Sequence, residues 1–351
     1  MTGMAFQTID EVLSSNKLIE NKRLFVVCNT KAATPSLTSD TFRMDTEYFS
    51  DDEFEELVAM FGVLGIPMDF FTYEDDFIKY ILNHPNMDWS NVIVYNAAQS
   101  GIGAGRKSLV PAFCNLHNIV CTGSNAYVVS LCRHKYHVNR ILAQNGIHVP
   151  KTWLYSVGWL QNEAPPSGTK IIVKPIYESA SIGIDNMSIQ VYEPKVDDFV
   201  SQRAIKHRQP MIAQEFVEGY EAESPQVCLN NRVYSLGVVG LAIDGEKNLG
   251  GKILDYDRIY SDKYEFYDMA DEQMLISEMK QCAGDVVSIL GMEGLCRVDF
   301  RINQNGSFFV TDVSTNPHFV SHSSVSFSIN QLGYKPIHIA QAILNAAIIR
   351  G

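Results

Sequence analysis

Short apolar runs separated by amphipathic stretches organise the first third of the chain. Four segments have the length and composition of buried strands: RLFVVCN (23–29), IPMDFFTY (66–73), NVIVYNA (91–97) and IVCTG (119–123). DDEFEELVAMFGVLG (51–65) has acids in its first turn and predicts a helix. Strands that alternate with a helix predict a small parallel α/β unit. Residues 1–21 are polar and irregular, which predicts an amphipathic lead-in or a frayed terminus.

The middle and the end of the chain follow different patterns. Ser124 or Asn125 can cap one helix that carries VVSLCRHKYHVNRILAQNG and stops at Gly146. Beyond EAPPSG the pattern predicts strands in KIIVKP, MSIQVY, MIAQEFV, SPQVCLNN and RVYSLGVVGLAI. The remainder predicts a helix over 272–291, a pair of strands, a serine-rich loop and a closing helix with apolar residues at helical spacing (Ile337, Ala340, Leu344, Ala347).

Composition narrows the class of protein. Of 351 residues, 46% are hydrophobic and 19% are charged, which predicts a folded protein of two or three packed units. The formal net charge of −12 argues against a generic nucleic-acid surface, because phosphate backbones need a basic face. A bound polyphosphate would therefore have to meet a local cluster of lysines and a metal ion.

The cysteines and the apolar runs bear on the cellular compartment. Seven cysteines are widely spread without a C-x-x-C pair, which predicts reduced core thiols in place of a disulfide framework or a zinc site. No signal peptide opens the chain, and no apolar run approaches the roughly 18 residues of a membrane span. We therefore expect a cytoplasmic protein with no membrane or nucleic-acid partner.

The segment AQSGIGAGRKS (98–108) looks like a phosphate-binding loop but matches neither familiar template. A P-loop needs glycine directly before its Lys-Ser pair, where this chain has Arg106. A G-x-G-x-x-G fingerprint that starts at Gly101 or Gly103 would need glycine at Arg106 or Ser108. The segment follows a predicted strand, at the sheet edge where α/β proteins bind ligands. Its glycines therefore predict either a backbone that approaches a ligand or a flexible crossover.

A predicted hairpin near the end of the chain brings two acids together. In LCRVDFRINQNGSFFVTDVSTNP (295–317), two apolar runs flank Asn305-Gly306, a dipeptide preferred in type I′ turns. This turn would place Asp299 opposite Asp312 and Arg297 opposite Ser314, with all four side chains on one face. Facing carboxylates repel by about 0.2–1 kcal/mol in an exposed sheet.

Two interpretations of this acid pair remain open from the residues alone. Mg²⁺ bridged to phosphate oxygens would relieve the repulsion, and Arg297 would stabilise charge on a transferred phosphoryl group. The alternative is a solvated hairpin in which Arg297 neutralises both acids.

Five separated segments support the first interpretation: GSNAYVVSLCRHKYHVNRILAQNGIHVPKTW, IIVKPIYESASIGI, IAQEFVEGYEAE, CRVDFRI and TDVSTNPHFVSHSSVS. In their order and spacing the chain resembles the ATP-grasp ligases, and among them most closely the D-alanine:D-alanine ligase family. The resemblance implies an α/β ATP-grasp fold and the cofactors ATP and Mg²⁺. It also implies three domains: an N-terminal α/β substrate domain (1–122), a central strand-rich lid domain (123–218) and a C-terminal catalytic domain (219–351).

The resemblance assigns a nucleotide site residue by residue. Lys135 and Lys174 match the lysines that hold ATP phosphates. ESASIG matches the glycine- and serine-rich loop over the phosphates, with Glu178 among the nucleotide contacts and Ser181 in both binding and catalysis. AQEFVEGYE matches the segment that reads adenine and ribose, through Gln214, Glu215, Phe216, Val217 and Glu221.

The resemblance also assigns metal, catalytic and amino-acid sites. Asp299 and Asp312 match metal ligands, Ser314 stands where the family normally has Asn, and Asn316 is a fallback ligand. Arg297 matches the catalytic arginine, and Arg258 lies near the family's flexible-loop lysine. SHSSVS matches the serine loop that receives an amino-acid carboxylate, with His322, Ser323 and Ser324 as substrate contacts.

The main departure from the family is upstream. The first strand leads into NTKAATPS, with no acid at the position that binds the first substrate's amine in D-alanine ligases, and AQSGIGAGRKS replaces a later acidic loop. Gln99, Ser100, Gly101 and Arg106 are therefore the predicted acceptor contacts. A basic loop predicts an acceptor that is anionic or rich in hydroxyls, and not D-alanine.

The predicted activity is ATP-dependent C–N bond formation between a small-molecule acceptor and an amino acid, by a homodimer. Among relatives, the ligases of mycosporine-like amino-acid biosynthesis fit the altered loops. The alternatives are a dipeptide ligase of the D-alanine:D-alanine type and, given Ser314, a non-catalytic nucleotide-binding protein.

Overall fold

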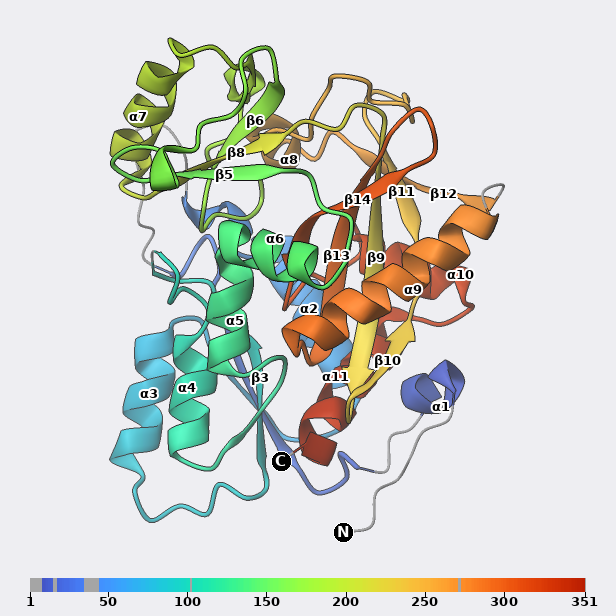
Figure 1. Ribbon diagram of the computed structural model, residues 1–351. Helices are drawn as coiled ribbons and strands as arrows, with labels where there is room; N and C mark the ends of the chain where they lie inside the picture. Colours follow the sequence, from blue (N-terminus) through green and yellow to red (C-terminus); the bar gives the residue numbers. More distant parts are fainter. Residues whose placement is uncertain (1–7, 15–17, 35–43, 102, 271–272, 351) are drawn as a thin grey trace.

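The computed structural model describes residues 8–14, 18–34, 44–101, 103–270 and 273–350. These residues form three sheets, which lie around the centre of the molecule (Figure 1). The N-terminal sheet has the strand order β2-β1-β3-β4, and the central sheet has the order β5-β8-β6-β7. The C-terminal sheet has the order β12-β11-β9-β13-β14, with β10 paired to β9. The predicted α/β class is confirmed, whereas the domain boundaries stay a prediction.

The N-terminal sheet is parallel, as predicted. Its strands are β1 (Arg23–Cys28), β2 (Met68–Phe71), β3 (Val92–Ala97) and β4 (Val120–Cys121). Helix α2 (Asp51–Gly62) packs on one face, and α3 (Glu74–Asn83) and α4 (Leu109–Leu116) pack on the other. A short 3₁₀ turn, η1 (Met44–Glu47), precedes α2, which begins with a capping box between Ser50 and Glu53.

The single helix expected after residue 125 is two helices, which corrects the prediction. Asn125 caps α5 (Ala126–Arg133), and α6 (Lys135–Gln144) follows after a break at His134. The backbone of His134 leaves the helical region, at φ −89° and ψ 84°, and its side chain accepts a hydrogen bond from the amide of His137. The amide of Lys135 then donates to the carbonyl of Ile176, so the break ties α6 to the end of β6.

The central sheet is antiparallel and has its own core. Its strands are β5 (Thr152–Tyr155), β6 (Lys170–Pro175), β7 (Ile189–Val191) and β8 (Met211–Glu215). Helix α7 (Val196–His207) covers one face, and two short 3₁₀ turns, η2 (Leu160–Asn162) and η3 (Asn186–Ser188), lie in its connections. The end of β6 therefore carries Lys174 toward the rest of the molecule.

The C-terminal sheet is built around a long central strand. Its strands are β9 (Tyr220–Leu229), β10 (Arg232–Ser235), β11 (Val239–Ala242), β12 (Glu265–Asp268), β13 (Gly294–Ile302) and β14 (Phe308–Ser314), and α8 (Tyr256–Tyr260) lies before β12. The run RVYSLGVVGLAI, expected as one strand, is interrupted near Gly237 to give β10 and β11. The turn between β9 and β10 has positive φ at both Asn230 and Asn231, as a type I′ turn requires.

Helices bury both faces of this sheet. Helix α9 (Gln273–Leu290) packs on one face together with α5 and α6. Helix α10 (Ser324–Gln331) lies in the segment expected as a serine-rich loop, and α11 (Pro336–Arg350) follows it. Helix α11 is shared between the N-terminal and C-terminal sheets, because it contacts β3 and β9 and its buried residues belong to one core with them. The short α1 (Ile9–Ser14) packs on α11, which favours the amphipathic alternative for this segment.

The hairpin of β13 and β14 has the predicted register but a different turn. Asp299 faces Asp312 and Arg297 faces Ser314, as expected. Near the tip, however, Ile302 faces Phe308, so the loop is longer by one residue and only Gly306, not Asn305, has positive φ. A bulge after Asp299 offsets this difference: Thr311 is the extra residue, and its hydroxyl donates to the carbonyl of Asp299.

The cysteines and the helices match what the composition predicts about disulfides and membrane spans. The seven cysteines are free, and six of them are buried. Across the described ranges, the helices are all too short or too polar to cross a membrane.

Gly219 fixes the start of β9, and its replacement is a test of the fold. Its φ is +135°, and a Cβ atom would lie 2.1 Å from the carbonyl oxygen of Ile302. We expect Gly219→Ala to lower the free energy of unfolding by about 3 kcal/mol or more, because strain and a backbone clash add. Gly146→Ala is the matched control, since Gly146 also has positive φ but no atom within 4 Å of the added methyl. Equal losses for the two variants in urea unfolding would contradict this account.

Candidate active site

A cavity of about 620 Å³ is lined by strands of the central and C-terminal sheets and by segments that connect the strands of the N-terminal sheet. Its floor is the hairpin of β13 and β14, where Arg297, Asp299, Asp312 and Ser314 all line the cavity. The four side chains therefore share one face, as the sequence predicts.

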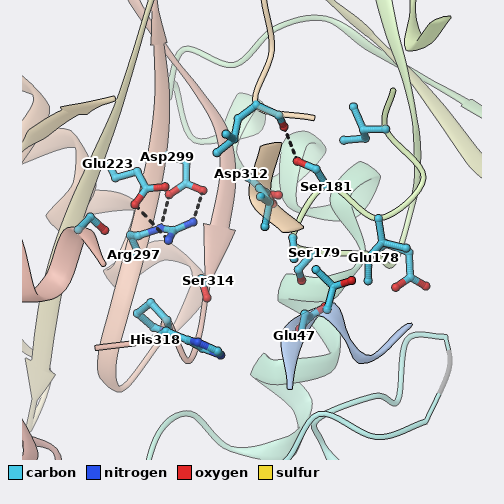
Figure 2. A pocket seen from close by; sticks show the side chains of 18 of the residues that line it. Glu47, Glu178, Ser179, Ser181, Glu223, Arg297, Asp299, Asp312, Ser314 and His318 are labelled. Atoms are coloured by element: carbon cyan, nitrogen blue, oxygen red, sulfur yellow. Dashed lines mark hydrogen bonds and ion pairs between the residues drawn. The ribbon is translucent and has the colours of Figure 1, made fainter. Parts of the chain in front are cut away.

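Each acid on the floor has its own cation in place. Arg297 binds Asp299 through two hydrogen bonds of 2.7 and 2.9 Å and contacts Glu223 at 3.1 Å (Figure 2). Asp312 pairs with Lys135 at the start of α6. The alternative in which Arg297 neutralises both acids is therefore wrong, because Asp312 takes its cation, Lys135, from helix α6.

The charged groups of the floor shift one another's pKa values. Burial alone would raise the pKa of Asp312, but Lys135 and Lys174 outweigh it and hold that pKa below its ordinary value. Burial and the neighbouring Lys135 lower the pKa of Lys174 to about 8. Burial raises the pKa of Glu223 to about 7 against the opposing effect of Arg297. A nucleotide would thus meet an ionised Asp312 and a lysine whose pKa is about 8.

The floor fits a divalent cation that is shared with phosphate. In the described part of the chain, no three His, Cys, Asp or Glu side chains form a metal cage. Mg²⁺ does not need one, since it prefers one or two carboxylates together with substrate phosphates. Asp299 and Asp312 supply these carboxylates, Ser314 adds a hydroxyl beside them, and Asn316 lines the same cavity while its amide donates to the carbonyl of Asn96 at 2.7 Å.

The predicted adenine and ribose contacts lie together along another wall of the cavity. The amide of Gln214 donates to Thr152, and the ring of Phe216 lies under the cations of Lys170 and Arg301. Arg301 also binds Glu221 at 3.0 Å and the carbonyl of Val217 at 3.0 Å. All five predicted residues line the cavity (Gln214, Glu215, Phe216, Val217, Glu221).

Residues 177–183, which we call the phosphate loop, cross over the cavity between these walls. Ala180 and Ser181 both have positive φ, at 49° and 51°, which is strained for residues other than glycine. The Ser181 hydroxyl donates to the carbonyl of Leu254, and Ser179 accepts from Arg133. Contacts with neighbouring elements therefore hold the loop in a conformation that its own sequence disfavours.

The predicted amino-acid site also lines the cavity. Ser323 caps α10, and Ser324 lies buried beside Glu223. His322 pairs with Asp262 and packs against Tyr264. This serine segment (321–324) lines the same cavity as Arg297, and its role as an amino-acid site stays a prediction.

Four predicted residues do not line the cavity: Ser100, Gly101, Arg106 and Arg258. Arg258 binds Asp255, the residue that caps its own helix α8. Arg106 is only 2% exposed and binds Glu178 at 3.0 Å. The expectation that the basic loop faces an anionic acceptor is therefore corrected, because acids of the same chain neutralise it.

Sequence reasoning missed acids and a histidine on the cavity wall. Glu47 and Glu53 line the cavity, and neither was among the predicted site residues. His318, which stacks on Phe49 at 4.7 Å, also lines it. The Ser50-x-x-Glu53 pattern before an apolar run was a visible capping signal for Glu53. Glu47 had no such signal.

Comparisons with known proteins agree with this geometry. A family model described as "D-ala D-ala ligase C-terminus" matches residues 149–345. The D-alanine–D-alanine ligase of Trichlorobacter lovleyi is 23% identical over 216 residues, which cover 61% of this chain and 64% of that relative. The match thus spans a little less than two thirds of that relative's length.

Two solved structures share the fold over nearly the whole chain. The D-alanine–D-alanine ligase of Bacillus anthracis complexed with ATP has a TM-score of 0.67 and 15% identity, covering 93% of this chain and 97% of that one. The VanG D-Ala:D-Ser ligase of Enterococcus faecalis has a TM-score of 0.65 and 17% identity, covering 93% and 100%.

The predicted ATP-grasp fold is therefore confirmed. Ligases of this family use ATP and Mg²⁺, for which the floor and the adjoining wall have suitable residues. Because the family model covers more than half of its residues, the chain belongs to the D-alanine:D-alanine ligase family of ATP-grasp ligases.

Proposed function

We propose that the protein joins an activated acceptor to the amine of an amino acid, with ATP converted to ADP and phosphate. The observation that carries this proposal is the floor of the cavity, where Asp299 and Asp312 face each other beside Arg297, Lys135 and Lys174. Phosphoryl transfer needs no nucleophilic side chain from the protein, because positioning and charge stabilisation account for its catalysis.

The reaction has two steps. An acceptor oxygen attacks the γ-phosphorus of ATP, and ADP leaves. The amine then attacks the carbon that bears the phosphorylated oxygen, phosphate leaves with the C–O bond electrons, and the nitrogen loses a proton. Asp299 and Asp312 would hold Mg²⁺, which would neutralise negative charge on the ATP phosphates.

The remaining residues position the reactants. Lys135 and Lys174 hold phosphates as point charges, and Arg297 stabilises charge at the transferred phosphoryl group. The serine segment 321–324 receives the amino-acid carboxylate. Gln214 and its neighbours along the adenine wall hold the base and the ribose. We also propose that the protein forms a homodimer.

For the acceptor, we propose the cyclohexenone core of a mycosporine. The enzyme would then join mycosporine-glycine to Ser or Thr in the biosynthesis of a natural product. The part of the cavity near Gln99 favours a substrate that donates hydroxyl hydrogen bonds. The side-chain oxygen of Gln99 is buried and has no hydrogen-bond partner among the described residues. Tyr48 and Ser321 line the same cavity. The phosphorylated oxygen would then be that of an enolised ketone.

A second candidate is a dipeptide ligase that acts on another amino-acid pair. It is favoured by Glu47 and Glu53, which line the cavity and carry the charge that a substrate ammonium group would need. Glu47, however, is paired with Lys107 at 2.5 Å. The two candidates differ in whether the acceptor carries an amine.

A substrate screen tests the function. ADP formation is measured with Mg²⁺ and each amino acid, alone and together with mycosporine-glycine, a plain cyclohexenone or D-alanine. We expect ADP release that requires both Ser or Thr and the cyclohexenone acceptor. Release with amino acids alone would favour the dipeptide ligase. No stimulation by any amino acid would contradict both and leave a nucleotide-binding protein.

The metal ligands give a second test. Asp312→Asn is expected to slow ADP formation by about 100-fold or more, the scale seen when one preorganised electrostatic group is lost. Ser314→Asn restores the residue usual in the family and should lower the Mg²⁺ concentration for half-maximal rate, whereas Ser314→Ala should not. An unchanged Mg²⁺ dependence in all three variants would contradict the assignment.

Lys174 predicts how nucleotide affinity depends on pH. With a pKa of about 8, the free lysine is charged below pH 8 and loses its proton above it. Because phosphate binds the charged form, ADP affinity should be constant below pH 8 and fall by up to about tenfold per pH unit above it. Lys174→Arg, which stays charged, should remove most of this fall in calorimetric titrations from pH 7 to 9.5. A wild-type affinity independent of pH would overturn the role of Lys174.

A further inference from the structure

Five charged side chains form a buried cluster beside the cavity: Glu47, Arg106, Lys107, Arg133 and Glu178. Their side chains are between 1% and 11% exposed. The cluster joins the turn η1, the acceptor loop (98–101 and 103–108), the end of α5 and the phosphate loop. Buried charges are costly unless paired, so each element is held where its counter-charge lies.

Arg106 is the link between the two loops. It binds Glu178 of the phosphate loop at 3.0 Å and lies 3.7 Å from Glu47. It also donates to the carbonyl of Gln99 within its own loop. Gln99 and Lys107 of the acceptor loop line the cavity, and so do Glu178 and Ser179 of the phosphate loop. One buried side chain thus fixes the position of both walls.

The phosphate loop depends on such outside contacts. Its residues Ala180 and Ser181 are strained, at a cost of about 1–3 kcal/mol each. Glu178 is held by Arg106 and by Gln209 at 2.9 Å, and Ser179 accepts from Arg133 at 3.2 Å. The opposite end is held by Arg203, which donates to the carbonyl of Gly183 and binds both oxygens of Asp185.

We propose that Arg106 is a positioning residue that couples the acceptor loop to the phosphate loop, so that a nucleotide that orders one loop also orders the other. Coupling of this kind is reciprocal: an acceptor that orders its loop tightens nucleotide binding by the same factor. The inference rests on the proposed function, because it takes the nucleotide phosphates to lie under the phosphate loop.

Hydrogen exchange tests the coupling without a known acceptor. The full chain is measured with and without Mg²⁺ and the non-hydrolysable ATP analogue adenylyl imidodiphosphate. In the wild type, amides of both 177–183 and 103–108 should exchange more slowly with the nucleotide, by a factor between about 5 and 150. In Arg106→Gln, the slowing should persist in 177–183 and vanish in 103–108.

Arg203→Gln is the matched control, because it removes a buried arginine that holds the other end of the phosphate loop without touching residues 103–108. A purely structural role for Arg106 predicts that both variants lower the melting temperature and that both keep the nucleotide effect in 103–108. Arg106→Lys, which keeps the charge, should recover part of the effect, and Glu178→Gln should lose it as Arg106→Gln does.

The outcomes separate this inference from the proposed function. An undiminished response of 103–108 in Arg106→Gln would overturn the coupling, while ligase activity in the substrate screen would stand. Absence of any slowing in wild-type 177–183 would overturn the coupling and also the placement of the phosphates. Should Arg106→Gln fail to fold, the comparison of Arg106→Lys and Glu178→Gln with Arg203→Gln decides in the same way.

Discussion

Two carboxylates held face to face need positive charge close by, and this need organises the cavity. Asp299 takes its cation from Arg297 on its own strand, whereas Asp312 takes Lys135 from α6 and feels Lys174 at the end of β6. The acid pair therefore binds together elements that are far apart in the sequence. The break at His134 belongs to the same arrangement, since it sets Lys135 at the start of a new helix, tied to β6.

The sequence predicted the acid pair correctly but for an incomplete reason. The Asn305-Gly306 signal implied a two-residue type I′ turn, and that backbone geometry is found instead at Asn230–Asn231. The actual tip is longer, and the bulge at Thr311 returns the strands to the predicted register. Periodicity thus identified the face of each strand, while the path of the turn depended on local hydrogen bonds, such as those that Asn303 accepts from Asn305 and Ser307.

Long-range electrostatics set the limit of what the sequence could predict. A basic loop around Arg106 suggests an anionic ligand as long as its neighbours are unknown. The structure brings in Glu178 from 72 residues away, and the side chain is buried instead of facing a substrate. Glu47 escaped notice for the same reason, since a carboxylate in an irregular segment has no periodicity that marks it. Motif matching did select residues that line one cavity, on the floor and along the adenine wall, while their roles stay a prediction.

The bulge at Thr311 also separates the part of the hairpin that carries the acids from the tip, where the length of the chain can vary more freely. Strand β13 is held along its whole length by β9, from Gly294 to Ile302, so Asp299 does not rely on the tip for its alignment. The exposed chain between Asn303 and Ser307 can therefore tolerate changes of length that a two-residue turn would not. For protein engineering, this tip is a place where extra polypeptide can be grafted at a distance from the chemistry.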